Sequence, residues 1–159
     1  MASEYGDFHA VVASLAARRP PGPETAEPIA SVAVLGAGPV GQACACAALA
    51  AGRQVSLHCL YGDALDRLLA AGGITVRGAD LVGTYRVAEG DHPDPHVRVA
   101  RSVDDAVRGA DIIVLAVPAG MHATWAGLLA PTLGPDQLVA LVPARPFGAV
   151  EVVRELRRV

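Results

Sequence analysis

The sequence predicts a doubly wound α/β domain, with a mainly parallel sheet that carries an inserted β-hairpin. Short apolar runs alternate with helical patterns from Ala30 onward. Hydrophobic residues make up 52% of the chain but aromatic residues only 4%, so the core must consist of Ala, Val and Leu. This composition is typical of a sheet that helices cover on both faces. A glycine-rich turn at 36–41 also joins the first strand to the first helix, as in a βαβ unit.

Each expected element follows from local patterning. We expect strands at 31–35, 54–60, 97–99, 111–117 and 137–142, and helices at 40–51, 63–71, 102–108, 121–129 and 149–158. Two short runs at 74–77 and 81–87 flank Gly78-Ala79-Asp80 and predict the hairpin. Ser102 is the expected N-cap of its helix, because acidic residues follow in the first turn.

Residues 1–29 stand apart from the domain predicted at 30–159. Within them, residues 7–19 predict a short amphipathic helix, whose apolar face consists of Phe8, Val11, Val12 and Leu15. The proline-rich stretch at 19–28 cannot continue that helix, so it is interpreted as a linker. The 159-residue chain therefore predicts one domain with an N-terminal extension.

Composition excludes several classes of function. The net charge of −3 offers no electrostatic basis for binding nucleic acid. The chain contains no lysine, which excludes a Schiff-base lysine and a P-loop lysine. The uncharged stretch at 29–52 is long enough to span a membrane, but its glycines and Pro39 favour a strand, a turn and a helix. We therefore expect neither a nucleic acid nor a membrane as partner.

The three cysteines, Cys44, Cys46 and Cys59, lack the spacing of a disulfide framework or a zinc site. They are expected to be small buried hydrophobic residues, and no metal is expected. Acidic Glu4 and Asp7 stand where a secretory signal would be basic. Together these features favour the cytoplasm.

The glycine turn is the strongest functional signal. An apolar strand leads directly into Gly36, Gly38 and Gly41, which have the spacing G-x-G-x-x-G, and then into an alanine-rich helix. The first glycine makes the tight turn, the second admits a pyrophosphate, and the third packs the helix against the strand. Pro39 and Val40 open the helix, whose free N–H groups attract phosphate. The alternative is a tight turn in a domain that has lost its cofactor.

The loop after the second strand lacks the usual acidic residue. An Asp or Glu normally binds the adenosine ribose of NAD there, but this sequence has Cys59. Asp63 comes later and is interpreted as a helix N-cap, while Arg67 lies one turn into the helix. Without a carboxylate to repel a 2′-phosphate, NADP is slightly favoured over NAD. His58 is interpreted as a strand residue near the rim.

Two further loops follow the last two strands at the same edge. The first contributes Val117, Pro118, Ala119 and His122 as candidate cofactor-binding residues. His122 has two interpretations, a contact with cofactor or substrate, or a helix-start histidine bonded to nearby backbone. Arg145 also has two, a contact with the nicotinamide end or a substrate carboxylate, or an exposed loop arginine. Trp125 is expected to pack between helices or to face a partner.

Four stretches carry a family resemblance: 34–41, 71–78, 109–119 with His122, and 141–149. In order and spacing they resemble the N-terminal NAD(P)-binding domain of the opine dehydrogenases, the octopine and nopaline dehydrogenase group. That group belongs with the 6-phosphogluconate-dehydrogenase-like Rossmann proteins. The A-V-P-A-x-x-H and P-x-R-x-x-G-A segments make the resemblance more specific than the glycine turn does.

The resemblance implies reductive condensation of an α-keto acid with the amine of an amino acid, using NAD(P)H. It also implies that a second, mostly helical domain supplies the acid/base histidine. No part of this chain matches that domain, so no catalytic residue is assigned, and the isolated chain is expected to bind the dinucleotide without robust turnover. The missing part is expected from a second helical domain or a homodimer partner. The alternatives are a stand-alone non-catalytic nucleotide-binding module and a ketopantoate-reductase-like dehydrogenase.

Overall fold

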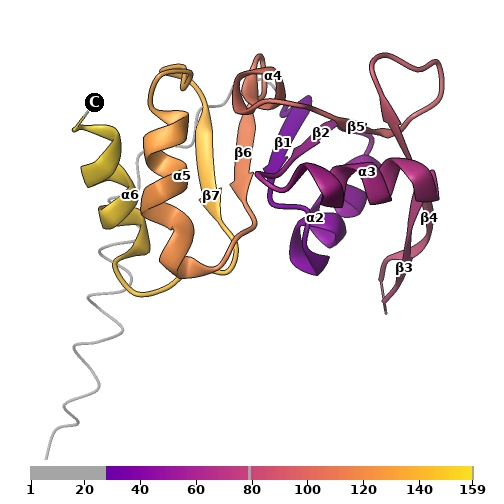
Figure 1. Cartoon of the computed structure of the whole chain (residues 1–159), viewed down its shortest axis with the longest axis horizontal. Coiled ribbons are helices and arrows are strands. Elements are labelled where there is room, and N and C mark those ends of the chain that lie inside the picture. Colours follow the sequence, from indigo (N-terminus) through magenta and orange to yellow (C-terminus); the bar gives the residue numbers. More distant parts are fainter. Residues whose placement is uncertain (1–27, 79, 159) are drawn as a thin grey trace, which may run out of the picture.

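The computed structural model describes residues 28–78 and 80–158, and the expected helix at 7–19 lies outside them. The strands form one seven-stranded sheet in the order β3-β4-β5-β2-β1-β6-β7 (Figure 1). The strands are β1 Ser31–Leu35, β2 Gln54–His58, β3 Gly73–Arg77, β4 Val82–Glu89, β5 Val97–Val99, β6 Ile112–Leu115 and β7 Leu138–Leu141. The helices are α2 Pro39–Ala50, α3 Gly62–Ala71, α4 Val103–Val107, the 3₁₀ turn η1 Ala119–Met121, α5 His122–Leu129 and α6 Gly148–Leu156.

The topology confirms the predicted doubly wound class. Strand β1 pairs in parallel with β2 on one side and with β6 on the other. The chain therefore builds outward from β1 in one direction and then returns to build in the other. The predicted hairpin is present as the antiparallel pair β3–β4, and β4 also pairs in parallel with β5. The hairpin thus extends the main sheet to one of its edges.

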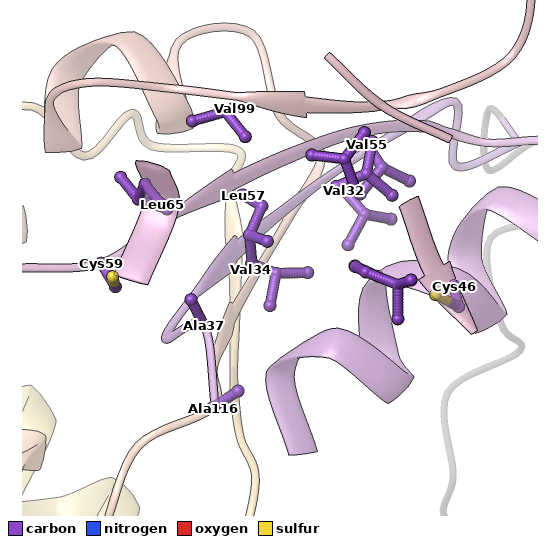
Figure 2. Close-up of a cluster of buried hydrophobic side chains, with 14 residues drawn as sticks. Val32, Val34, Ala37, Cys46, Val55, Leu57, Cys59, Leu65, Val99 and Ala116 are labelled. Atoms are coloured by element: carbon purple, nitrogen blue, oxygen red, sulfur yellow. The ribbon is translucent and has the colours of Figure 1, made fainter. Parts of the chain in front are cut away.

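Alternation along β1 divides the core between the two faces of the sheet. Val32 and Val34 belong to one apolar cluster, which α2 and α3 cover (Figure 2). Ala33 and Leu35 belong to the other cluster, to which α4 and α5 contribute buried side chains. Cys46 of α2 is fully buried in the first cluster, and its burial raises the pKa of the thiol to about 11. Cys46 and Cys59 are therefore buried as the sequence predicts, whereas Cys44, also on α2, is half-buried.

Boundaries differ from the expected ones by one or two residues in several places. Ser102 caps α4 as predicted, because its hydroxyl accepts the Asp105 N–H at 3.1 Å. Strand β2 ends at His58, two residues earlier than expected, since the chain turns at Cys59 toward α3. The helix expected at 121–129 is preceded by the 3₁₀ turn η1. Among the described residues, no helix is long and apolar enough to cross a membrane.

At the edge where the parallel strands begin, Asp111 ties β6 to β1. Its carboxylate accepts the N–H of Ala30 at 2.7 Å and the N–H of Ser31 at 2.9 Å. These hydrogen bonds lower the pKa of Asp111 below its usual value. The two central strands are therefore held in register at their starts, which aligns the loops at their carboxyl ends.

Candidate functional site

A hollow of about 420 Å³ lies at the carboxyl ends of β1, β2 and β6. Three of the four loops singled out by the sequence meet there, together with the first two turns of α3 and the start of α5. Its lining residues are Gly36, Ala37, Gly38, Cys59, Leu60, Tyr61, Ala64, Arg67, Ala116, Val117, Pro118, Met121 and Trp125. The hollow lies where the winding direction of the sheet reverses, which is where ligands bind in open α/β sheets.

A second hollow, of about 490 Å³, lies at the opposite edge, where β1 and β2 begin. Its polar lining mixes basic Arg53 and Arg98 with acidic Asp91 and Asp94. Arg98 is already bound by Asp105 at 2.9 Å. The lining of this second hollow contains neither a glycine turn nor the start of a long helix. The first hollow, at the carboxyl edge of the sheet, is therefore the better candidate site.

The first and third glycines of the turn are required by the fold itself. Gly36 has a φ of +119°, and a Cβ there would lie 2.3 Å from the backbone oxygen of Ala116. A Cβ on Gly41 would lie 1.7 Å from the backbone oxygen of Gly36. Both contacts are with backbone atoms, which cannot rotate away as a side chain can. These two positions therefore exclude every residue larger than glycine.

Gly38 is different, because nothing in the described part of the chain demands a glycine there. A Cβ on Gly38 would have no atom within 4 Å, and the residue is in an extended conformation with a φ of −70°. It nevertheless lines the hollow and caps α2 without a side-chain hydrogen bond. Pro39 follows as the first residue of the helix, so the N–H groups of Val40 and Gly41 have no partner within the helix. This open, uncapped helix start fits a pyrophosphate.

Hydrogen bonds hold the turn in place. The Gly36 N–H donates to the backbone oxygen of His58 at 2.7 Å, which joins the turn to the end of β2. The Gln42 side-chain amide donates to the backbone oxygen of Ala37 at 2.8 Å. Sequence reasoning did not single out Gln42. Its signal was an amide side chain in the first turn of a helix that is otherwise built from small and apolar residues.

The side of the hollow next to β2 contains no acidic lining residue among those described. Cys59 is buried there, and its thiol donates to the backbone oxygen of Tyr61 at 3.1 Å. Arg67 is the charged residue of the lining, and it is paired with Asp63 at 2.6 Å. Tyr61 is 71% exposed although it is aromatic. Sequence reasoning missed Tyr61. Its signal was an aromatic residue directly after the strand expected at 54–60.

The loop after β6 is divided between the hollow and the protein interior. Val117 and Pro118 line the hollow, and Ala119 begins η1. His122 lies behind them, fully buried and outside the lining. Within the described part of the chain, neither of its ring nitrogens has a hydrogen-bond partner. The backbone bond expected in one interpretation is therefore not formed, and α6 lies close by, since a Cβ on Gly148 would be 3.7 Å from His122 Nδ1.

Trp125 and His58 form a buried aromatic pair beside the hollow. Their rings meet edge to face, with 6.1 Å between the centroids. Trp125 packs in the second core cluster and also lines the hollow. His58 is a buried strand residue, and its Nδ1 lies 2.8 Å from the backbone oxygen of Ala100.

Arg145 lies on the fourth loop, after β7, and does not line the hollow. Its half-exposed guanidinium pairs with Glu151 in the first turn of α6. No group of three or more His, Cys, Asp or Glu residues within residues 28–78 and 80–158 is arranged to hold a metal ion.

Comparison with known proteins places this site in a family context. Residues 31–140 match the family model described as "NADP oxidoreductase coenzyme F420-dependent". The chain is also 32% identical over 125 residues to an opine dehydrogenase from Arthrobacter sp. (strain 1C). That match covers 79% of this chain but 32% of the Arthrobacter protein. The chain therefore spans about a third of the length of that relative.

Solved structures of dehydrogenases share the fold. An octopine dehydrogenase determined with NADH and pyruvate superimposes with a TM-score of 0.63 and 23% identity, over 80% of this chain and 32% of its own. Glycerol-3-phosphate dehydrogenase from Coxiella burnetii superimposes with a TM-score of 0.61 and 20% identity, over 80% of this chain and 38% of its own. The expected resemblance to the opine dehydrogenases is thus confirmed in sequence and in fold.

Proposed function

The chain belongs to the NADP oxidoreductase, coenzyme F420-dependent, family, and we propose that it is the NAD(P)-binding part of an opine-dehydrogenase-like oxidoreductase. The observation that carries the proposal is Gly38, a glycine that the protein's own packing does not require, at an uncapped helix start. The name of the Arthrobacter relative and the NADH in the octopine dehydrogenase structure support the same proposal.

In this proposal the pyrophosphate lies against Gly38. The N–H groups of Val40 and Gly41 donate to its oxygens, and the positive end of the α2 dipole adds attraction. Pro39 restricts the backbone that precedes these donors. Gly36 contributes shape, because its turn brings the end of β1 under the phosphates.

The adenosine half occupies the side of Cys59, Tyr61 and Arg67. The exposed Tyr61 ring offers a face for adenine. Arg67 binds a 2′-phosphate when it exchanges the Asp63 carboxylate for that phosphate. Since no acidic residue of the described lining repels the phosphate, the proposal keeps a lean toward NADP.

The nicotinamide half lies against Val117, Pro118, Ala119 and Trp125. Their apolar surface excludes water from one side of the ring. His122 supports this loop from behind, and contact with the cofactor requires the loop to open. Arg145 stands at the same edge of the sheet and would bind the nicotinamide end, or a substrate carboxylate, in exchange for Glu151.

The bound NAD(P)H supplies a hydride, which in the proposed reaction reduces the imine formed from an α-keto acid and an amino-acid amine. This chain binds and orients the dinucleotide. A second helical domain or a homodimer partner supplies the acid/base group that such a reduction needs. Accordingly, no residue of this chain is assigned a catalytic role.

A second candidate function is a nucleotide-binding module without chemistry of its own. It is favoured by the lining of the hollow, which among the described residues contains no His, Asp or Glu to move a proton.

The proposal has two parts, that this chain binds the dinucleotide and that turnover needs another domain. An assay of the pure chain with NADPH, α-keto acids and amino acids tests the second part. We expect dinucleotide binding without opine formation, and robust opine formation by the chain alone would contradict the need for another domain.

Calorimetric titration with NADPH and with NADH tests the binding itself. We expect saturable binding of each nucleotide, with NADPH the tighter. Gly38→Val is expected to abolish binding while the protein stays folded, because the branched side chain fills the phosphate space. Gly127→Val on α5 is the matched control, since a Cβ there also has no atom within 4 Å but lies outside the hollow. Unchanged affinity in folded Gly38→Val, or no binding of either nucleotide by the wild type, refutes the proposal.

A further inference from the structure

Helix α3 borders the carboxyl-edge hollow but is packed lightly against the rest of the fold. Leu65 is its one buried side chain among those described. Tyr61, which precedes the helix, caps it without a side-chain hydrogen bond. Both Tyr61 and Arg67 line the hollow, so the position of α3 sets the positions of these two side chains. Whatever holds α3 in place therefore shapes the side of the hollow next to β2.

Arg101 forms a polar connection between α3 and the sheet. Its Nη1 donates to Asp66 Oδ1 on α3 at 2.7 Å. Its Nε donates to Oε1 of Glu89, the last residue of β4. Within the described part of the chain, the contact with Asp66 is the one side-chain hydrogen bond or ion pair that joins α3 to another element. The hydrogen bonds with Asp66 and then Glu89 raise the pKa of Arg101 above its usual value.

The backbone that carries Arg101 is itself held at the carboxyl edge of the sheet. Arg101 lies two residues after the end of β5. The preceding residue, Ala100, donates its N–H to the backbone oxygen of Leu57 at 2.9 Å, and its own backbone oxygen lies 2.8 Å from His58 Nδ1. A planar guanidinium has donors on separate nitrogens and can bind two carboxylates at once. Arg101 therefore links α3 and β4 to the end of β2.

Solvent exposure limits what this connection contributes to the stability of the fold. The side chains of Arg101, Asp66 and Glu89 are 50%, 64% and 50% exposed. Single ion pairs at such exposure contribute little to stability, and a network contributes more. Loss of Arg101 should therefore leave the protein folded. Its effect should fall on the position of α3, which has few other contacts to hold it.

We propose that Arg101 is a positioning residue for the adenosine half of the nucleotide. It ties α3 to the sheet through Asp66 and Glu89. Tyr61 and Arg67 are thereby held where they bind adenine and a 2′-phosphate. This inference rests on the proposed function and adds a determinant of affinity that lies outside the lining of the hollow. Supporting contacts of this kind set how precisely a binding group is held.

Calorimetric titration of the full chain with NADPH and with adenosine 2′,5′-bisphosphate tests the proposal. In Arg101→Ala both affinities are expected to fall by about three- to tenfold, the range for loss of two exposed ion pairs. The two losses should be equal, because the bisphosphate contains the adenosine half alone. Arg98→Ala is the matched control, since it also removes an ion pair that joins β5 to a helix, the pair with Asp105 on α4. Its affinities should equal those of the wild type.

Asp66→Ala separates positioning from charge. If Arg101 acted only through its positive charge, removal of the nearby Asp66 carboxylate would strengthen binding of the anionic nucleotide. Positioning predicts the opposite, a loss comparable to that in Arg101→Ala. The double variant should lose no more affinity than either single variant, because both substitutions remove the same contact.

Hydrogen exchange of the unliganded protein measures the hold on α3 directly. Exchange of the amides at 62–71 should be faster in Arg101→Ala than in the wild type, and unchanged in Arg98→Ala. A wild type that binds neither NADPH nor the bisphosphate refutes the proposed function and overturns this inference with it. If the wild type binds, this inference alone is overturned by equal affinity in Arg101→Ala, by higher affinity in Asp66→Ala, or by unchanged exchange of α3.

Discussion

The two halves of the carboxyl-edge hollow are built by different means. At the half proposed for the phosphates, backbone atoms set the shape, since a Cβ on Gly36 would clash with the main chain of Ala116 and a Cβ on Gly41 with that of Gly36. At the half proposed for the adenosine, the side chains of Cys59, Tyr61 and Arg67 set the shape and the charge. A backbone constraint leaves a residue-type signature in the sequence, because only glycine satisfies it. A side-chain surface can be made in many ways, so its specificity must be read from the structure.

The largest expected effect is at the phosphate half. Gly41→Ala puts a Cβ 1.7 Å from the backbone oxygen of Gly36, so α2 must move away from β1. We expect a loss in the free energy of unfolding of about 3 kcal/mol or more, at the upper end for an overpacked core. Urea denaturation followed by circular dichroism measures it. Gly38→Ala is the matched control and should unfold as the wild type does, because its Cβ has no neighbour within 4 Å.

Equal stability of the Gly41→Ala and Gly38→Ala variants would contradict the difference in packing between the two positions. It would mean that α2 can shift at no cost, and that the third glycine does not hold the helix against β1. A large loss in both variants would mean that Gly38 also has a structural role, and the argument for an open phosphate space would fail.

The fold could be predicted because its main constraints are local. In β1, alternate residues supply the two faces of the sheet. At the start of α4, the signal is Ser102 followed within three residues by Asp104 and Asp105. The pairing of β4 with β5 could not be predicted in the same way, since it depends on where the hairpin lies in space. The end of β2 at His58 was missed because apolar residues continue past the point where the chain turns.

The candidate site was predictable at its glycines and less so at its side chains. The sequence places His122 and Trp125 on one helix but does not reveal depth. In the structure Trp125 reaches the hollow, while His122 is buried behind it. Arg145 was a candidate for binding an anion, and the anion that it meets within the chain is Glu151, six residues later. Such pairings depend on the turn into α6, which leaves no simple pattern of spacing.

A smaller effect is expected at the adenosine half. Cys59→Asp introduces a carboxylate that accepts the ribose hydroxyls of NADH and repels the 2′-phosphate of NADPH. We expect the ratio of the two dissociation constants to shift toward NADH by about tenfold, the size of a hydrogen bond to a charged group. Titration with both nucleotides measures the ratio. Cys59→Ser is the control for size and burial, and a ratio equal to that of Cys59→Ser would place the ribose contact elsewhere.

The smallest effect is expected at His122, on the loop after β6. A substitution there tests whether backbone atoms or side chains determine the part of the site that this loop forms. Its buried ring nitrogens have no partner among the described residues, so His122→Phe replaces an unsatisfied polar ring with an apolar one. We expect the free energy of unfolding to stay level or to rise by about 1 kcal/mol, with nucleotide affinity unchanged. Urea denaturation and calorimetric titration measure the two quantities.

His58→Phe is the matched control for that substitution, because His58 is also buried but contacts the backbone oxygen of Ala100 through Nδ1. Loss of that partner should destabilise the protein by about 1–3 kcal/mol. If His122→Phe destabilises it as much, His122 has a polar partner that the described contacts do not include. If stability holds but nucleotide affinity falls, the loop opens on binding and His122 contacts the cofactor, so the nicotinamide side of the site would depend on side chains as the adenosine half does.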